Sequence, residues 1–151
     1  MYRLLYVSFT TFEPELEQYI DILKVSRKRN TASNISGVLL AAGRTYMQVL
    51  EGEKEMVMAT FDRIRADRRH DNVTLLAAEI VDERLFPAWS MGFFHMTAIE
   101  DLVDYGLINN RETALRGVLS RHVSHDPIAS TLLVYLDQNA ELLKKTSAAH
   151  A

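Results

Sequence analysis

The chain has 151 residues, of which 48% are hydrophobic, so it is long enough to form one domain with a core of its own. Its formal net charge of −3 gives no overall attraction to nucleic acid or to an anionic membrane. The chain contains no cysteine, which excludes disulfides and thiolate metal sites.

The sequence also indicates where in the cell the protein is expected to be. No apolar run approaches the ~18 residues that a membrane-spanning helix needs. The first residues, MYRLLYVS, lack the charged and then apolar build of a secretory signal. We therefore expect a cytoplasmic protein.

The first 95 residues contain the patterns of five strands and two helices. Alternating side chains predict a first strand over residues 2–8. Apolar residues at helical spacing predict a helix over residues 15–29, followed by a loop over residues 30–34. The other predicted elements are strands 35–42 and 45–51 joined by a turn at Gly43, a helix 53–67, and strands 73–81 and 89–95.

This order of elements, β-α-β-β-α-β-β, predicts an α+β fold, a ferredoxin-like sandwich with helices on one face of a mostly antiparallel sheet. We expect the first and third strands to lie side by side at the centre of the sheet and to run parallel. Tyr6 and Gln48 would then be neighbours, and both could point toward the helices.

The character of the chain changes at Thr97, after which amphipathic helices are predicted. Thr97-x-x-Glu100 is a capping box before a short helix, Asn110 can cap a second helix, and Asp126-Pro127 can start a third. We expect these helices to cover the second sheet face, which carries Leu5 and Val7. The predicted organisation is a domain of residues 1–96, a helical extension of residues 97–145 that closes with Lys144-Lys145, and a frayed tail of residues 146–151.

Polar side chains occupy positions where packing alone would favour apolar ones. Ile22, Ser26 and Asn30 follow one row along a helix face, and Gln48 lies in the middle of a strand. A buried amide without partners costs roughly 2–7 kcal/mol, so these groups need something to bind. With Tyr6 they form a hydrogen-bonding ring of the size that a planar heterocycle would occupy.

Each of these residues also has an ordinary structural explanation. Ser26 can bond back to its own helix, and Asn30 can cap the helix end. Gln48 can be a solvent-facing residue of an edge strand, and core tyrosines such as Tyr6 generally find one partner for the hydroxyl.

The combination of motifs is more specific than any single residue. Four motifs occur in one order: R-L-L-Y-x-S, N-x4-I-S-G-V-L-L-x7-Q-V-L-E-G, D-x-R-H and F-x-x-W-S-M-G-F. In this order and spacing, residues 2–95 resemble the BLUF family, whose members sense blue light using flavin. The resemblance implies a photoreceptor without enzymatic activity and a noncovalently bound flavin, with FAD expected and FMN or riboflavin as alternatives. The lack of cysteine excludes the other class of small flavin photoreceptor, which forms a cysteine adduct.

The resemblance also implies roles for particular residues. Tyr6 would give an electron and a proton to the excited flavin, and Gln48 would bridge the Tyr6 hydroxyl to the flavin N5 and O4 atoms. Asn30 would bond the pyrimidine end of the ring, while Ile22 and Ser26 would line the same slot.

Residues later in the chain would complete this site. Arg69 and His70 would meet the ribityl or phosphate end of the flavin. Met91 would lie on the fifth strand near Gln48, with Trp89 two residues before it, and which of the two approaches the flavin is left open. Arg29 stands beside the flavin asparagine, where family members often have asparagine or histidine, so a contact from Arg29 is not carried over.

The chain has no effector domain of its own, so the resemblance implies a separate cytoplasmic effector protein, possibly a cyclic-di-GMP phosphodiesterase. We also expect a homo-oligomer. An acylphosphatase-type hydrolase on the same fold is an alternative, but residues 8–12 offer neither the glycine nor the arginine of a phosphate-cradling loop. A flavin-free regulatory or interaction module is another. His122 and His125 have no third ligand near them, so no metal site is expected.

Overall fold

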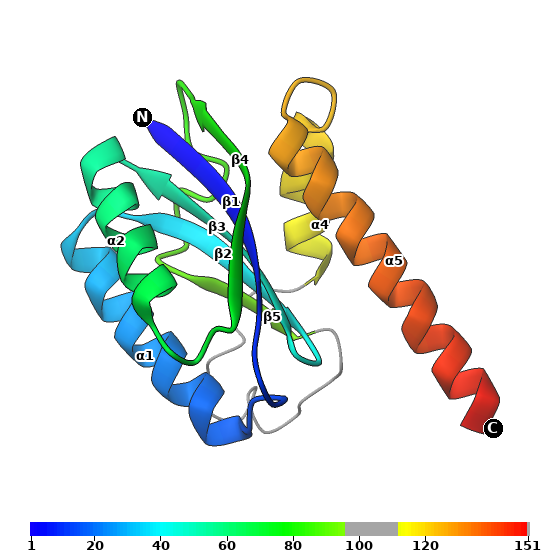
Figure 1. The fold of residues 1–151 in the computed structure, drawn as a ribbon. Helices are drawn as coiled ribbons and strands as arrows, with labels where there is room; N and C mark the ends of the chain where they lie inside the picture. Colours follow the sequence, from blue (N-terminus) through cyan, green and yellow to red (C-terminus); the bar gives the residue numbers. More distant parts are fainter. Residues whose placement is uncertain (96–111, 151) are drawn as a thin grey trace.

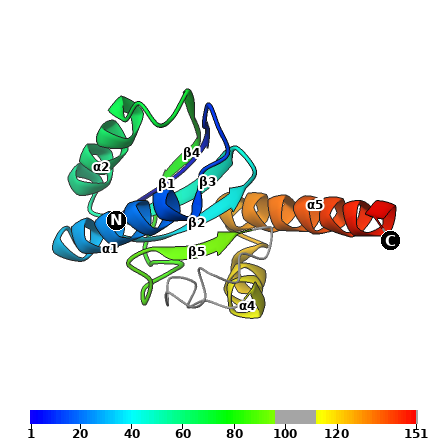
Figure 2. The same ribbon diagram turned by 90° about the horizontal axis from the view of Figure 1, so that it is seen from below.

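The computed structural model describes residues 1–95 and 112–150 of the chain. Its centre is a five-stranded sheet in the order β4-β1-β3-β2-β5, with α1 and α2 on one face and α4 and α5 toward the other (Figures 1 and 2). The strands are β1 (Tyr2–Phe9), β2 (Ser36–Ala42), β3 (Thr45–Gly52), β4 (Asn72–Ile80) and β5 (Gly92–His95). The helices are α1 (Leu16–Ala32), α2 (Lys54–Ala66), α4 (Glu112–His122) and α5 (Pro127–His150).

The two central strands, β1 and β3, are neighbours as expected, but the expectation that they run parallel is wrong. They pair antiparallel, and Tyr6 lies directly opposite Gln48. The crossover through α1 brings β2 back in the direction of β1, and the hairpin then reverses the chain into β3. Gly43 makes this turn with a φ of 55°, a conformation that glycine adopts without strain. The expected ferredoxin-like α+β class is confirmed, because only the β2–β5 pairing is parallel.

The sheet separates two hydrophobic cores, because successive strand residues face opposite sides. Leu4 and Tyr6 belong to the core under α1 and α2. Leu5 belongs to the opposite core, where residues of both C-terminal helices are completely buried, among them Leu115, Leu119, Ile128 and Leu132. The expectation that C-terminal helices cover the second face is therefore confirmed.

The start of α5 follows the predicted cap. The Asp126 carboxylate accepts hydrogen bonds from the backbone N–H groups of Ile128 and Ala129, at 2.9 and 3.3 Å. The helix continues to His150, beyond the Lys144-Lys145 pair that was expected to close it. The capping box at Thr97, the short helix after it and the cap at Asn110 lie outside the described residues.

Two boundaries differ from the sequence pattern near the candidate site. Helix α1 continues to Ala32, so Asn30 lies in its last turn and not in a loop. Strand β5 begins only at Gly92, so the expectation that Trp89 and Met91 lie on the fifth strand is wrong. Two side chains of α1, those of Arg27 and Asn30, donate hydrogen bonds to backbone carbonyls of this segment.

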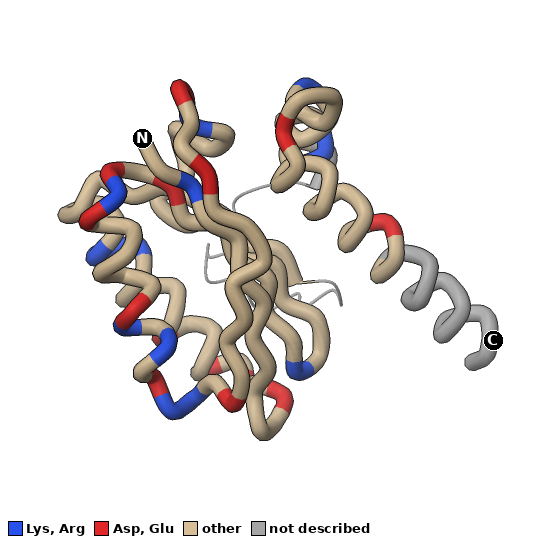
Figure 3. The backbone as a smooth tube through the Cα atoms, turned by 45° about the horizontal axis from the view of Figure 1, so that its top comes forward, with Lys and Arg blue, Asp and Glu red and all other residues tan. Residues whose placement is uncertain are grey.

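Charged residues of both signs occur along the two helices that cover the cleft face of the sheet. Figure 3 shows Lys and Arg interleaved with Asp and Glu over α1 and α2. No helix among residues 1–95 and 112–150 combines the length and apolar character that a membrane span needs.

Candidate functional site

A cleft opens between α1 and α2 above the central strands, with about 850 Å³ of space that includes open solvent. The predicted site residues that line it are Tyr6, Ile22, Ser26, Asn30, Gln48, Arg69 and His70. These predicted residues come from α1, from β1 and β3, and from the loop after α2.

The floor of the cleft carries a chain of hydrogen bonds through Gln48. The Tyr6 hydroxyl donates to Oε1 of Gln48, and Nε2 of Gln48 donates to the sulfur of Met91 at 3.2 Å. Gln48 is only 5% exposed, so the explanation as a solvent-facing glutamine is wrong. A carboxamide has two N–H donors, so the contact with Met91 leaves one for a ligand.

Tyr6 is held as a neutral donor. Burial raises the pKa of the Tyr6 hydroxyl above its ordinary value, and the neighbouring Tyr46 and Asp67 raise it further. The Tyr6 ring packs against Phe61 of α2, with ring centroids 5.4 Å apart. Tyr6 therefore keeps its proton at physiological pH, and its orientation is fixed between the sheet and α2.

Met91, and not Trp89, approaches Gln48. The Trp89 ring stacks on Phe86 at 5.4 Å and packs in the core under the C-terminal helices. Met91 is buried in the opposite core together with Tyr6. Met91 therefore lies on the Gln48 side of the sheet, although it is not among the residues that line the cleft.

Asn30 connects the cleft to the segment before β5. The side chain is 3% exposed, and its Nδ2 donates to the carbonyl oxygen of Ser90 at 2.7 Å. Arg27, one turn earlier on α1, donates through Nε to the carbonyl of Met91 at 3.0 Å. The amide of Asn30 thus bonds across the fold, and its Oδ1 remains a potential acceptor for a ligand.

Several of the side chains that line the cleft are charged. Arg69 donates from Nε to Asp67 at 3.0 Å, and this hydrogen bond lowers the pKa of Asp67 to about 2. His70 bonds to Ser8 Oγ through Nδ1 at 2.8 Å, and burial lowers the pKa of His70. Arg29 and Arg63 also line the cleft. Arg63 was missed by the sequence analysis, and guanidinium groups here would suit the phosphates of a nucleotide.

Tyr46 is a second residue that the sequence analysis missed. Its side chain is 2% exposed and lines the cleft two residues before Gln48. Strand alternation contains the signal that could have found it, since Tyr46, Gln48 and Leu50 share one face.

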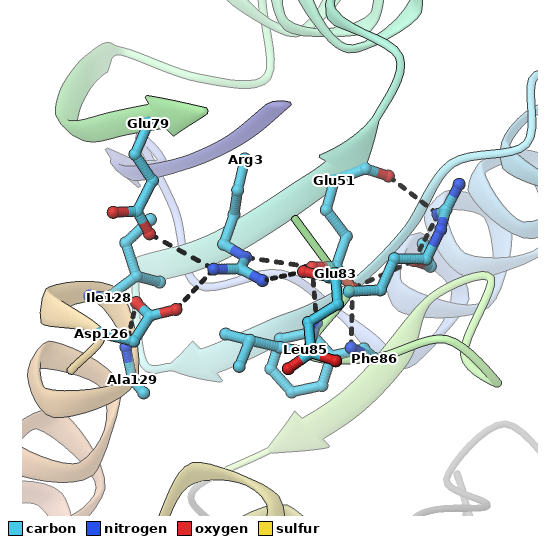
Figure 4. Close-up of polar contacts among 11 residues, drawn as sticks. Arg3, Glu51, Glu79, Glu83, Leu85, Phe86, Asp126, Ile128 and Ala129 are labelled. Carbon is cyan, nitrogen blue, oxygen red and sulfur yellow. Dashed lines mark hydrogen bonds and ion pairs between the residues drawn. The ribbon is translucent and has the colours of Figure 1, made fainter. Parts of the chain in front are cut away.

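A separate buried ion network lies on the opposite face of the sheet (Figure 4). Arg3 donates to Glu51 at 3.0 Å and to Asp126, the cap of α5, at 2.5 Å. Glu51 also accepts from the backbone N–H groups of Leu85 and Phe86. Arg3 lies three positions before Tyr6 on β1, and Glu51 lies three positions after Gln48 on β3, so this network joins both site strands to α5.

The fold places a buried tyrosine–glutamine pair at the floor of a cleft between α1 and α2. Residues 1–92 match the family model described as BLUF, sensors of blue-light using FAD. The chain therefore belongs to the BLUF family, and this domain is a blue-light sensor of the flavin-using type.

Relatives of known function and structure agree with this assignment. The chain is 35% identical over 100 residues to photoactivated adenylate cyclase subunit alpha of Euglena gracilis, a match that covers 64% of this chain and 10% of that protein. The photo-activated state of BlsA is 30% identical with a TM-score of 0.62, covering 80% of this chain and 92% of BlsA. These matches do not favour the hydrolase or the flavin-free module.

A third solved structure is similar to this chain in its fold alone. Klebsiella pneumoniae BlrP1, solved as a complex with calcium and cyclic di-GMP, has a TM-score of 0.68 at 21% identity. The match covers 90% of this chain and 34% of BlrP1. This chain spans about a tenth of the length of the photoactivated cyclase subunits that it matches.

The side chains present fit a flavin. An isoalloxazine ring has an imide edge with both donors and acceptors, and the cleft offers the free N–H of Gln48 and the Oδ1 of Asn30. The Tyr46 hydroxyl is buried and has no hydrogen-bond partner within the protein. Among the described residues, no group of three metal-ligating side chains comes together, and His122 and His125 form only a pair.

Proposed function

We propose that the cleft binds FAD noncovalently and that the protein is a photoreceptor with no catalytic activity of its own. FMN and riboflavin are the alternative ligands. The observation that carries this proposal is the buried chain from Tyr6 through Gln48 to Met91 at the floor of the cleft. A hydrolase would need a nucleophile or an activated water there, whereas this chain offers a phenol, a neutral amide and a thioether.

Different side chains of the cleft are proposed to contact different parts of the flavin. Asn30 would accept the imide N–H through Oδ1, and Gln48 would donate its second N–H to the ring edge. Ile22 and Ser26 on α1 would pack along the ring. Arg69 and His70 would meet the ribityl or phosphate end, and Arg29 and Arg63 would add positive charge to the cleft.

The flavin supplies absorption of blue light and the capacity, once excited, to take an electron from a nearby phenol. Tyr6 would be the donor of that electron, and its proton would leave along the hydrogen bond to Gln48. Both would return to Tyr6, so no substrate would be converted. The amide of Gln48 ends with its donor and acceptor atoms exchanged, because a carboxamide can rotate or tautomerise between the two arrangements.

The exchange at Gln48 changes what Met91 contacts. The Met91 sulfur accepts a hydrogen bond from an N–H of Gln48. If the amide oxygen of Gln48 took the place of that N–H, the sulfur would lose its hydrogen-bond donor. The Met91 carbonyl is bonded to Arg27, and the chain runs from Met91 directly into β5. We therefore propose that the signal leaves through β5, with the Arg3–Glu51–Asp126 network as a second route to α5.

The proposed receiver is a separate cytoplasmic effector protein, and the photoreceptor itself is proposed to be a homo-oligomer. A cyclic-di-GMP phosphodiesterase is the first effector class to test, because BlrP1 shares the fold and its structure contains cyclic di-GMP. Sedimentation velocity would measure the oligomer, and binding of a candidate phosphodiesterase would be compared in darkness and blue light. Equal binding in both conditions would contradict this part of the proposal.

The central test is the purified protein from a flavin-replete host. It should be yellow, and heat or acid should release an intact flavin, which chromatography identifies as FAD, FMN or riboflavin. Blue light should shift the flavin absorption band reversibly to longer wavelength, with recovery in darkness. Protein that binds no flavin under any condition would overturn the proposed function.

A further inference from the structure

The Tyr46 hydroxyl is an unsatisfied polar group. Among the described residues, only two buried side-chain nitrogen or oxygen atoms have no hydrogen-bond partner, the hydroxyls of Tyr46 and Tyr135. Leaving such a group unpaired costs about 1–3 kcal/mol, so an unpaired hydroxyl in a native protein calls for an explanation.

The surroundings of Tyr46 place this hydroxyl at the candidate ligand site. Tyr46 lines the cleft and lies on the same face of β3 as Gln48, two residues before it. Its ring is fixed by an edge contact with Tyr19 at 6.2 Å and by a contact with His70 at 5.8 Å. The ring is therefore held in place, and it stands between Gln48 and the charged end of the cleft.

The chemistry of the hydroxyl favours donation. Burial raises the pKa of Tyr46 above its ordinary value, and the neighbouring Tyr19 raises it further, while Arg69 opposes them. Tyr46 thus keeps its proton, and it needs an acceptor that the protein does not provide. Tyr135 lies on α5 in the opposite core and does not line the cleft, so its hydroxyl provides a comparison without a ligand.

We propose that Tyr46 is a flavin-binding residue whose hydroxyl donates a hydrogen bond to the ring or ribityl part of the ligand, on the side of Arg69 and His70. This inference rests on the proposed function, since it needs the cleft to hold a flavin. Tyr46 would be a polar contact of the ligand in addition to those proposed for Gln48 and Asn30. Flavin binding then satisfies a group that is unpaired in the free protein.

The test is Tyr46→Phe, which removes only the hydroxyl, with Tyr135→Phe as the matched control. Affinities for riboflavin and for FAD are measured separately, together with the melting temperatures of the flavin-free and flavin-loaded proteins. Tyr46→Phe should weaken both affinities by about fivefold to thirtyfold, the effect of one lost hydrogen bond. The flavin-free variant should melt at the same temperature as the wild type or higher, because an unpaired group is gone. Tyr135→Phe should leave both affinities unchanged.

Each other outcome overturns the inference. Wild-type affinity in Tyr46→Phe would mean that the hydroxyl makes no contact with the ligand. A loss for FAD alone would place the contact at the phosphate or adenine end. An equal loss in Tyr135→Phe would show a general effect of core changes. If the wild type itself binds no flavin, the proposed function fails first, and this result is distinguishable from a failure of Tyr46 alone.

Discussion

Arg3 and Asp126 are separated by 123 positions in the sequence, and their side chains form a buried ion pair of 2.5 Å. The pair joins the first strand of the sheet to the first turn of α5. Arg3 also binds Glu51 on β3 and Glu79 on β4, so one guanidinium connects three strands with the C-terminal helix (Figure 4). Burial raises the pKa of Glu79, and Asp126 raises it further, which reflects how closely the carboxylates share this cation.

The first prediction concerns this network. Asp126→Ala should lower the free energy of unfolding by about 3–5 kcal/mol, because it removes one partner of a buried ion pair and the cap of α5. Urea unfolding followed by circular dichroism would measure the loss. The flavin absorption band should keep its dark position, since Asp126 lies on the face of the sheet opposite the cleft.

Asp137→Ala is the matched control for this variant. Asp137 is on the same helix and pairs with Arg116, but its side chain is 66% exposed. Exposed pairs contribute about 0–1 kcal/mol, so this change should be nearly neutral. Equal losses in the two variants would show that the buried network has no special role in docking α5.

The second prediction concerns the photochemical pair. Tyr6→Phe should bind flavin and lose the light-induced red shift, because phenylalanine fills the same space next to Phe61 but has no proton to give. Gln48→Ala should also bind flavin and lose the normal shift. Absorption spectra before and after blue light would measure both effects, and a wild-type photocycle in either variant would contradict the mechanism while leaving the fold unaffected.

The third prediction separates Met91 from Trp89. Met91→Leu keeps an apolar side chain of similar volume but removes the sulfur that accepts from Gln48. It should change the rate of dark recovery after blue light, because the resting position of the Gln48 amide loses one of its partners. Trp89→Phe alters the opposite core, where the ring stacks on Phe86, and should leave the recovery rate near that of the wild type. The reverse pattern would mean that Trp89 is the residue coupled to the flavin.

The sequence was sufficient to predict the meeting of Tyr6 and Gln48, because alternation determines which face of a strand a residue occupies. It was insufficient for the direction of the central pairing. The hydrophobic pattern of each strand does not show how the chain connects one strand to the next. That connection makes β1 and β3 antiparallel. The antiparallel register places Tyr6 directly opposite Gln48, so the two are neighbours as the sequence predicted although the direction is wrong.

The segment before β5 shows a second limit. In a regular strand, Trp89 and Met91 would share one face, since they are two residues apart. In the protein they face opposite cores, because the segment is not a strand and its carbonyls are bound by Asn30 and Arg27. These contacts join residues about 60 positions apart. Neither the sequence of α1 nor that of the segment before β5 indicates them. The unpaired state of Tyr46 is equally invisible in the sequence, because it depends on every side chain around the cleft.

The last prediction concerns acid stability at the charged end of the cleft. The hydrogen bond from Arg69 lowers the pKa of Asp67 from 3.8 to about 2 in the folded protein. A lowered pKa means that the native state favours the ionised carboxylate, so the pair stabilises the protein above pH ~4. This contribution should disappear as the pH falls from about 4 to about 2, where Asp67 becomes protonated. Its size should be modest, because the Arg69 side chain is 54% exposed.

Asp67→Asn should therefore be less stable than the wild type near neutral pH, and the difference should shrink to nothing near pH 2. Urea unfolding of both flavin-free proteins between pH 2 and pH 6 would measure this difference. Asp62→Asn is the control, because the Asp62–Arg65 pair is exposed on both sides and should contribute little at any pH. A difference that stays constant across the range would show that Asp67 stabilises the loop by its shape and hydrogen bonds, and not by its charge.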